Sequence, residues 1–217
     1  MSARPTVPAF RADGSLMDLA DPRAEDIDFA TMGNALSKIA RFNGIHKGGA
    51  YSVAQHSAMG ADALYRESGD AVLAGYFLLH DGHEYLVGDW TRPSVALLKH
   101  HAAAFAGGSL SAVVAEAIRQ GIDAAKAAID RAVWQAAGLP DIGRMPLYAR
   151  QVKDMDDRML RAEALALFGP AAAADLPAAG RPVPRLTGTI DPWGAGKAEM
   201  AFIDRLERYL RIVVRPA

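Results

Sequence analysis

The sequence predicts an all-α protein, and three observations lead to this prediction. Apolar residues recur at helical spacing in several segments, which prolines, glycines and capping residues separate. No two segments read as paired strands, and no internal repeat is visible. The chain has 217 residues, which is enough for one substantial domain but tight for two independent cores. We therefore expect one helical bundle over residues 31–217, preceded by an N-terminal arm over residues 1–30.

Four elements are expected in the first part of the chain. Residues 1–30 are rich in Pro, Asp and Arg and contain Asp-Gly and Asp-Pro turn signals, which predict an irregular arm or a short hairpin. Helical spacing predicts a helix over 29–39, and a Ser-x-x-Gln capping box begins another over 52–67. A third helix is expected over 70–87, with Gly88 as the residue that ends it.

Proline and glycine also divide the second part of the chain. Alanine-rich helices are expected at about 94–105 and 110–137, followed by a helix at about 147–168. Residues 169–196 are rich in Ala, Pro and Gly and predict a surface loop. The last helix, Ala198–Val213, has four apolar residues at core spacing: Met200, Ile203, Leu206 and Leu210.

Composition excludes several classes of protein and of site. Hydrophobic residues make up 51% of the chain and the formal net charge is −1, which favours a packed protein without a nucleic-acid-binding surface. The absence of cysteine excludes disulfides, thiolate metal sites, Fe–S clusters and a cysteine nucleophile. No apolar stretch approaches the roughly 20 residues that cross a bilayer, and the first residues do not resemble a secretion signal. We expect a cytoplasmic protein without a membrane partner.

The segment FLLHDGHEYLVGD, residues 77–89, ends an apolar run in a cluster of ionisable side chains. On a helical wheel His80, Asp81 and Glu84 share a sector that faces the core. A polar cluster at a frayed helix end, satisfied by caps and water, is one interpretation. Burial of unpaired carboxylates is costly, however, and a metal ion or cationic partner is the usual solution. The segment is therefore a candidate metal site if other helices supply further ligands.

Two other predicted helices supply such residues. His56 lies near the centre of the apolar stripe of the 52–67 helix, where an ordinary hydrogen-bonded core histidine is the alternative. In the 147–168 helix, Asp156 points along the apolar face, whereas Asp154 and Asp157 point to the polar side. The combined set has two imidazoles and two carboxylates: His56, His80, Asp81 and Asp156. These donors suit one Mn²⁺, Co²⁺, Fe²⁺ or Zn²⁺ ion better than Ca²⁺, with Mg²⁺ as a further candidate.

This H…HD…D order resembles the signature of the HD-domain metal-dependent phosphohydrolase superfamily, an all-helical fold that hydrolyses phosphate esters. Five further stretches occur in the order seen in its bacterial 5′-deoxynucleotidase-like branch: DLADP, NALSKIARFNG, YSVAQHS, LLHDGHEYLVGD and VKDMDDRMLRAE. The resemblance spans roughly residues 14–168 and is weaker in the last helix. It implies an HD-domain helical bundle, and because such relatives often form dimers, we expect a homodimer.

The resemblance also implies roles for individual residues. Glu84 and Asp89 match acids that orient or deprotonate the attacking water, and Arg41 matches a residue that grips the substrate phosphate. Taken alone, Asp89 reads as a turn residue and Arg41 as a solvated one. His83 is close to the site in sequence and is a candidate for phosphate binding or acid catalysis. Phe42 stands where the best-known nucleotidases of this branch have a tryptophan against the sugar, which weakens the case for deoxyribose selectivity.

Three other histidines have open roles. His46 is close to the site in sequence, so it shares with His83 the choice between phosphate binding, acid catalysis and a surface role. Two-metal members of the superfamily add histidine ligands after the HD pair, which makes His100 and His101 candidate ligands of a second metal ion. Their alanine-rich segment fits an exposed helix end better.

The expected function is metal-dependent hydrolysis of a nucleotide, most directly of a (deoxy)nucleoside 5′-monophosphate. One alternative is a triphosphohydrolase of the same superfamily. A hydrolase of guanosine tetraphosphate alarmones is less favoured, because Glu84 is followed by Tyr85 and not by aspartate. A di-iron oxygenase on the same scaffold and a non-catalytic metal-binding module also fit a histidine and carboxylate ligand set. The base, the sugar, the number of phosphates and the native metal stay open.

Overall fold

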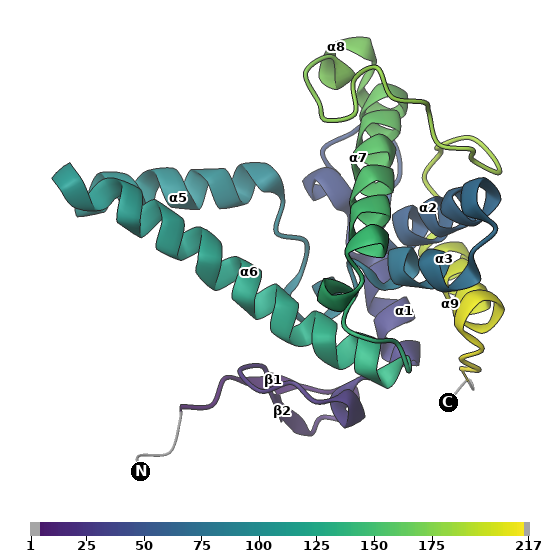
Figure 1. The fold of residues 1–217 in the computed structure, drawn as a ribbon, viewed down its shortest axis with the longest axis horizontal. Coiled ribbons are helices and arrows are strands. Elements are labelled where there is room, and N and C mark those ends of the chain that lie inside the picture. Colours follow the sequence, from purple (N-terminus) through teal and green to yellow (C-terminus); the bar gives the residue numbers. More distant parts are fainter. Residues whose placement is uncertain (1–4, 215–217) are drawn as a thin grey trace.

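Two buried helices, α2 (Val53–Ser68) and α3 (Ala71–Leu79), form the centre of the protein in the computed structural model, which describes residues 5–214 (Figure 1). Every residue from Val53 to Leu64 is buried, so α2 is covered on all sides and not along one stripe. The two helices pack directly against each other. The remaining residues of the predicted arm and domain, 1–4 and 215–217, lie outside the described part of the chain.

Capping residues set the ends of these two helices. The Ser52 hydroxyl accepts a hydrogen bond from the backbone N–H of Gln55 at 3.2 Å, which confirms the predicted start of α2. The Gln55 side chain does not complete the capping box; it donates to the carbonyl of Asp191 at 2.7 Å. Gly69 ends α2 in the left-handed conformation, and Asp70 caps α3 by accepting a backbone N–H at 3.0 Å.

Helix α9 (Ala195–Leu210) packs against both central helices, and helix α1 (Phe29–Lys38) packs against α2 and α9. The prediction of which face of α9 is buried is wrong in part, because Met200 is 74% exposed while Phe202 is fully buried. The buried residues of α9 are Ala198, Phe202, Leu206 and Tyr209. Both sets of residues repeat at helical spacing, and contact with α1, α2 and α3 selects the second set.

The prediction of one continuous helix over 70–87 is wrong. Helix α3 ends at Leu79, and a second short helix, α4 (Glu84–Val87), follows a tight turn. In this turn the backbone N–H groups of His80, Gly82 and Glu84 each donate to the carbonyl three residues earlier. A Cβ at Gly82 would lie only 2.9 Å from the carbonyl oxygen of Leu79, so the tight turn requires glycine there. Gly88 ends α4 as predicted.

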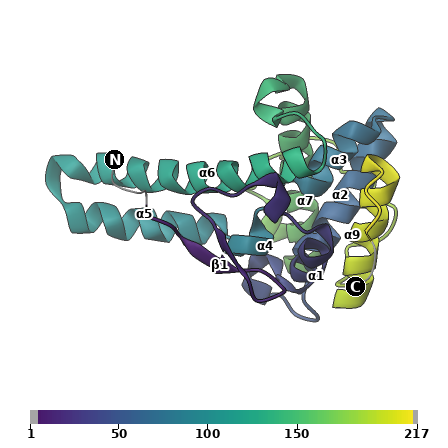
Figure 2. The same ribbon diagram turned by 90° about the horizontal axis from the view of Figure 1, so that it is seen from below.

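Helices α5 (Arg92–Ala106) and α6 (Ser111–Ala136) form an antiparallel hairpin that projects from the rest of the protein (Figures 1 and 2). Thr91 caps α5 by accepting the backbone N–H of Ser94, and Pro93 occupies the first turn, where its missing N–H costs nothing. Helix α5 has no buried residue, and most of the buried residues of α6 lie in its last two turns. Only the base of the hairpin therefore joins the core.

Helix α7 (Pro146–Phe168) passes beside α2 and α3, and a short helix, α8 (Pro170–Ala173), follows it (Figure 1). The predicted loop over 169–196 thus begins with a helical turn, and residues 174–194 form no further helix or strand. Arg158 of α7 binds Glu67 of α2 through two hydrogen bonds of 2.8 Å. This paired contact fixes α7 against the central helices.

The arm contains a two-stranded antiparallel hairpin, in which β1 (Pro8–Phe10) pairs with β2 (Leu16–Asp18). Of the two predictions for the arm, the short hairpin is the one confirmed. The hairpin lies near the bottom of Figure 1, and the 3-10 helix η1 (Ala24–Asp26) that follows it packs against α6. The rest of the described chain is helical or irregular, so the all-α prediction is confirmed. Within residues 5–214 no helix has both the length and the apolar character needed to cross a membrane.

Candidate metal centre

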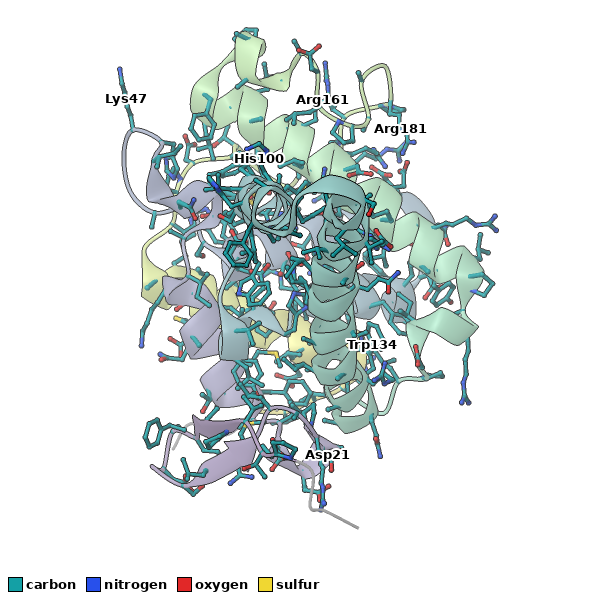
Figure 3. The ribbon with its side chains drawn as sticks, turned by 90° about the vertical axis from the view of Figure 1, so that its left-hand side faces the viewer. Asp21, Lys47, His100, Trp134, Arg161 and Arg181 are labelled. Carbon is teal, nitrogen blue, oxygen red and sulfur yellow. The ribbon has the colours of Figure 1, made fainter. Side chains whose placement is uncertain are left out.

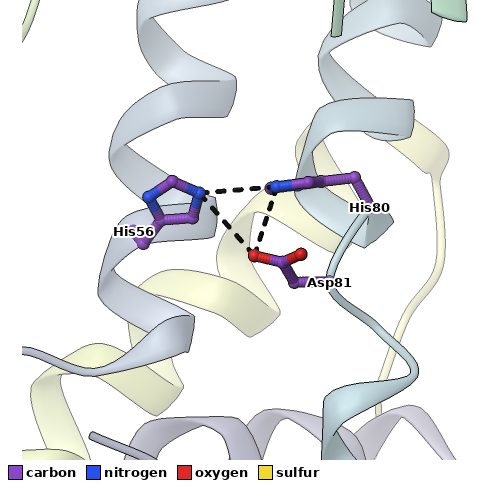
Figure 4. A group of neighbouring side chains, drawn as sticks. All are labelled: His56, His80 and Asp81. Atoms are coloured by element: carbon purple, nitrogen blue, oxygen red, sulfur yellow. Dashed lines mark hydrogen bonds and ion pairs between the residues drawn. The ribbon is translucent and has the colours of Figure 1, made fainter. Parts of the chain in front are cut away.

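Four predicted ligands from three segments meet in the core. His56 lies on α2, His80 and Asp81 follow the end of α3, and Asp156 lies on α7. The His56 and His80 Nε2 atoms are 3.4 Å apart, and Asp81 Oδ2 lies 3.2 Å from His80 Nε2 and 3.8 Å from His56 Nε2 (Figure 4). Asp156 Oδ1 lies 3.7 Å and 3.8 Å from the same two nitrogens. Ligands about 2.1 Å from one ion lie roughly 3.0–3.4 Å apart. The His56–His80 and His80–Asp81 distances match a single ion, and the three distances of 3.7–3.8 Å are a few tenths of an ångström longer.

Hydrogen bonds from Nδ1 set the tautomers of both histidines. His56 Nδ1 donates to Oε1 of the buried Glu163 at 2.5 Å, and His80 Nδ1 donates to the carbonyl of Phe77 at 2.6 Å. In its neutral form, each ring therefore points the lone pair of its Nε2 atom into the cluster. Two lone pairs 3.4 Å apart require a proton or a cation between them. Burial opposes a charge on His80, but Asp81 and Asp156 raise the pKa of His80 well above its usual range.

Glu163 is the residue that joins this cluster to Arg41. Its Oε1 accepts from His56 and from the Tyr51 hydroxyl at 3.0 Å, while its Oε2 accepts from Arg41 Nε at 3.1 Å. Arg41 Nη1 also lies 3.4 Å from Asp81 Oδ2. Burial works against the charge of Arg41, but Glu163 and Asp81 raise the pKa of its guanidinium, so it stays cationic. The arginine is buried and is not the solvated side chain that the sequence alone suggested.

Glu84 and Asp89 lie on the open side of Asp81. Burial, together with the charges of Asp81 and Asp89, raises the pKa of Glu84 to about 9. Burial also raises the pKa of Asp89, although Arg41 opposes the shift. Both carboxylates line the same cavity as Asp81. Asp89 is therefore a site-lining residue and not only the turn residue after Gly88.

A cavity of about 520 Å³ opens beside the cluster, which is the usual size of a small-molecule site. Phe42 and Phe168 form one wall and contact each other edge to face, with ring centroids 5.3 Å apart. Three basic residues also line it: Arg41, Arg92 and Lys126. A larger hollow of about 840 Å³, beside Arg158 and Arg181, contains none of the predicted ligands. The cavity beside Asp81 is therefore the candidate substrate site.

The other predicted histidines do not line this cavity. The His83 ring is buried and its Nδ1 donates to Asp130 at 2.9 Å. His46 Nε2 accepts the backbone N–H of Tyr51 at 3.2 Å, a contact that fixes its own loop. His100 and His101 are exposed on α5, and Figure 3, which looks along the hairpin, shows His100 there.

Asp157 differs from its prediction. Its side chain is 15% exposed, compared with 21% for Asp156, because it pairs with Arg92 at 3.0 Å and with Lys153 at 2.5 Å. Periodicity correctly separated the two directions, but it took no account of cations from α5. Asp154 is 40% exposed, in line with the prediction that it faces the polar side.

Sequence reasoning missed Glu163, Lys126 and Arg92. Glu163 lies seven residues after Asp156, which is two helical turns, so it was predictable on the same face of α7. Its partners are distant in sequence, and nothing local identified them. Lys126 and Arg92 belong to the hairpin, whose placement beside the cavity depends on tertiary packing.

Comparisons with known proteins add little to this geometry. No protein-family model matches the chain. An uncharacterized protein of Rhodobacter capsulatus is 36% identical over 91 residues, which cover 39% of this chain and 45% of that protein. The chain thus matches less than half the length of this relative, whose description names no activity.

Proposed function

We propose that the protein is a metal-dependent phosphohydrolase that acts on a nucleotide, most directly a (deoxy)nucleoside 5′-monophosphate. The observation that carries the proposal is the meeting of two imidazole Nε2 atoms with two carboxylate oxygens beside a basic, partly aromatic cavity. His56, His80, Asp81 and Asp156 would hold one Mn²⁺, Co²⁺, Fe²⁺, Zn²⁺ or Mg²⁺ ion. When bound, such an ion polarises the phosphate ester and lowers the pKa of water.

The surrounding residues supply the rest of the reaction. The oxygen of a water molecule attacks phosphorus, the P–O ester bond breaks, and the nucleoside leaves with its 5′-oxygen protonated. Glu84 is placed to take the proton of the attacking water, since a cation that offsets Asp81 lowers the raised pKa of Glu84. Asp89 lies beside it. Arg41, held in place by Glu163, faces the cavity and would neutralise phosphate charge.

The apolar wall suggests where the nucleoside binds. Phe42 and Phe168 offer ring surface to the cavity, and the Arg41 guanidinium lies 5.6 Å from the centroid of the Phe42 ring. Phe42 follows Arg41 directly and has a left-handed backbone (φ 56°), and its ring contacts Phe168 edge to face. A base or sugar against these rings would place its phosphate toward Arg41 and Asp81.

The test is release of phosphate, pyrophosphate or triphosphate from a panel of nucleoside mono- and triphosphates with Mn²⁺, Co²⁺ or Mg²⁺. Metal-dependent release should fall at least about 100-fold in Asp81→Ala and Glu84→Ala. His100→Ala, an exposed change on α5, is the control and should keep the wild-type rate. If metal binds but no nucleotide is hydrolysed, the phosphohydrolase proposal fails.

A triphosphohydrolase is the second candidate, and a specific observation favours it. Arg92 and Lys126 join Arg41 around the cavity, which gives more positive charge than one phosphate requires. The same panel separates the two candidates by the length of the phosphate chain released. A di-iron oxygenase and a non-catalytic metal-binding module are the outcomes left if release is absent.

A further inference from the structure

A second group of metal-ligand atoms lies next to the first. One oxygen each of Asp81 and Glu84 and one ring nitrogen of His83 lie within 4.8 Å of one another. Glu84 and His83 are each only 4% exposed. Among residues 5–214, neither His83 Nε2 nor Glu84 Oε2 has a hydrogen-bond partner. Buried polar atoms are rarely left without a partner, so these two atoms require an explanation.

The His83 ring is held as a metal-binding histidine is held. Its Nδ1 donates to Oδ1 of the buried Asp130 at 2.9 Å, which leaves Nε2 as the nitrogen with a free lone pair. This arrangement repeats that of His56 with Glu163 and of His80 with a backbone carbonyl. A carboxylate behind the imidazole fixes the tautomer and makes the ring a stronger ligand.

The charge around this group also favours a cation. Asp81, Glu84 and Asp89 bring three carboxyl groups to one side of the cavity. Arg41 is already bound to Glu163 and lies near Asp81, and in the described part of the chain no salt bridge reaches Glu84 or Asp89. Lys126 lines the same cavity without closing such a bridge. Carboxylates that converge without a partner cation are costly to bury.

We propose that His83, Glu84 and Asp81 hold a second divalent cation, with Asp81 shared between the two metal ions. One nitrogen and carboxylate oxygens suit Mn²⁺, Fe²⁺, Co²⁺ or Zn²⁺. The inference rests on the proposed metal centre, because Asp81 belongs to both ligand groups. It also replaces the expected phosphate contact of His83, whose ring does not line the cavity. With Glu84 bound to this cation, Asp89, the neighbouring carboxylate that lines the cavity, would take the proton of the attacking water. The second cation would face the cavity between Asp81 and Asp89, where a substrate phosphate would meet it.

Metal content of the whole chain tests this proposal directly. The chain is freed of metal by a chelator and dialysed against Mn²⁺, and bound metal is measured by mass spectrometry and by electron paramagnetic resonance. We expect two Mn²⁺ ions per wild-type chain, with spin coupling between them, and one uncoupled ion in His83→Ala. His46→Ala is the matched control, since His46 is also buried but contacts its own loop and the Phe168 ring and none of the proposed ligands, and it should keep two ions.

A second variant keeps the proposal testable if His83→Ala does not fold. Asp130→Asn retains the imidazole but weakens the group that orients it, so the second Mn²⁺ should bind about 10- to 100-fold more weakly. One ion in the wild type, lost in His56→Ala and unchanged in His83→Ala, would overturn the second site while the proposed hydrolase stands. In that case a proton shared by Glu84 and His83 satisfies both atoms. Absence of any bound ion would overturn both proposals.

Discussion

The central helix α2 and the hairpin helix α5 are similar in length but differ in almost every energetic respect. Twelve of the 16 residues of α2 are buried, whereas none of the 15 residues of α5 is. The charges near α2 have partners from distant segments, as in the Asp62–Arg205 pair at 2.7 Å. Away from its base, the hairpin has charges that pair along its own surface, as Arg119 does with Glu116 and Asp123. Substitutions in the two regions should therefore have effects of very different size.

The largest effect is expected at Glu163, the buried carboxylate behind His56. Glu163→Ala removes the buried carboxylate that accepts from both His56 Nδ1 and Arg41 Nε. Removal of one partner of such a buried pair costs about 3–5 kcal/mol, and metal affinity should fall with it. Urea unfolding and metal content measure the two losses, with Glu163→Gln as the isosteric control that should lose less. If Glu163→Ala costs no more than a surface change, the buried network is not what stabilises this region.

The pH dependence of stability should come from the same region. The pKa of Glu84 is about 9 in the folded chain, compared with an ordinary value of 4.5, so the folded state binds the extra proton between these values. Stability of the metal-free protein should therefore fall as pH rises from about 5 to 9, by up to about 1.4 kcal/mol per pH unit. His80, whose pKa is also raised, acts in the same direction. Urea unfolding at several pH values tests this, and Glu84→Gln should flatten the curve.

Two glycine-to-alanine substitutions, one in α2 and one in the hairpin, should change the free energy of unfolding in opposite directions. At Gly60 on α2 a Cβ would lie 2.1 Å from Phe77 Cε1, so Gly60→Ala forces α2 away from α3 and should cost about 1–3 kcal/mol. At Gly121 on α6 nothing lies within 4 Å, so Gly121→Ala should stabilise the protein by about 0.5–1 kcal/mol through helix propensity. Thermal unfolding of both variants checks the signs. Equal effects would show that the hairpin is as tightly packed as the core.

The smallest effect on folding is expected at the hairpin tip. Phe105 is 96% exposed, and Leu98 is exposed on the same helix, so changing both to Asp should alter the free energy of unfolding by less than about 0.5 kcal/mol. The same variant tests the homodimer expected from the sequence, because these exposed apolar side chains are candidates for its interface. Light scattering should then show the mass fall from two chains to one. Met200→Asp, exposed on α9, is the control; an unchanged mass in the tip variant would remove the hairpin from any interface.

Much of the fold was predictable because its signals are local. Ser52 capped the second helix as its sequence indicated, and the spacing of apolar residues located α1 and α7. The break after α3 was not predictable in this way, because the tight turn depends on the close approach of Gly82 to the backbone and to Val133 of α6. The prediction that Met200 is buried was wrong for a related reason, since only contact with other helices decides which face of α9 is buried.

In the candidate site, too, local sequence signals were predictive and contacts between distant segments were not. Each of the four predicted ligands was visible as a polar residue on an apolar face, and the structure brings them together. Their role as metal ligands stays a prediction. Glu163 was not identified, because its role comes from hydrogen bonds with Arg41 and His56, which are 122 and 107 residues away along the chain.

The tight turn at residues 80–84 has a consequence for how the protein tolerates change in its length. A regular helix would return to the same direction after four residues and would stack His80 above Glu84. The turn instead spreads neighbouring side chains, so His80, Asp81, His83 and Glu84 serve two ligand groups from five consecutive positions. A single inserted or deleted residue here would misalign both groups at once. The hairpin tip, around Gly107, has no such constraint and is the natural place to lengthen this chain.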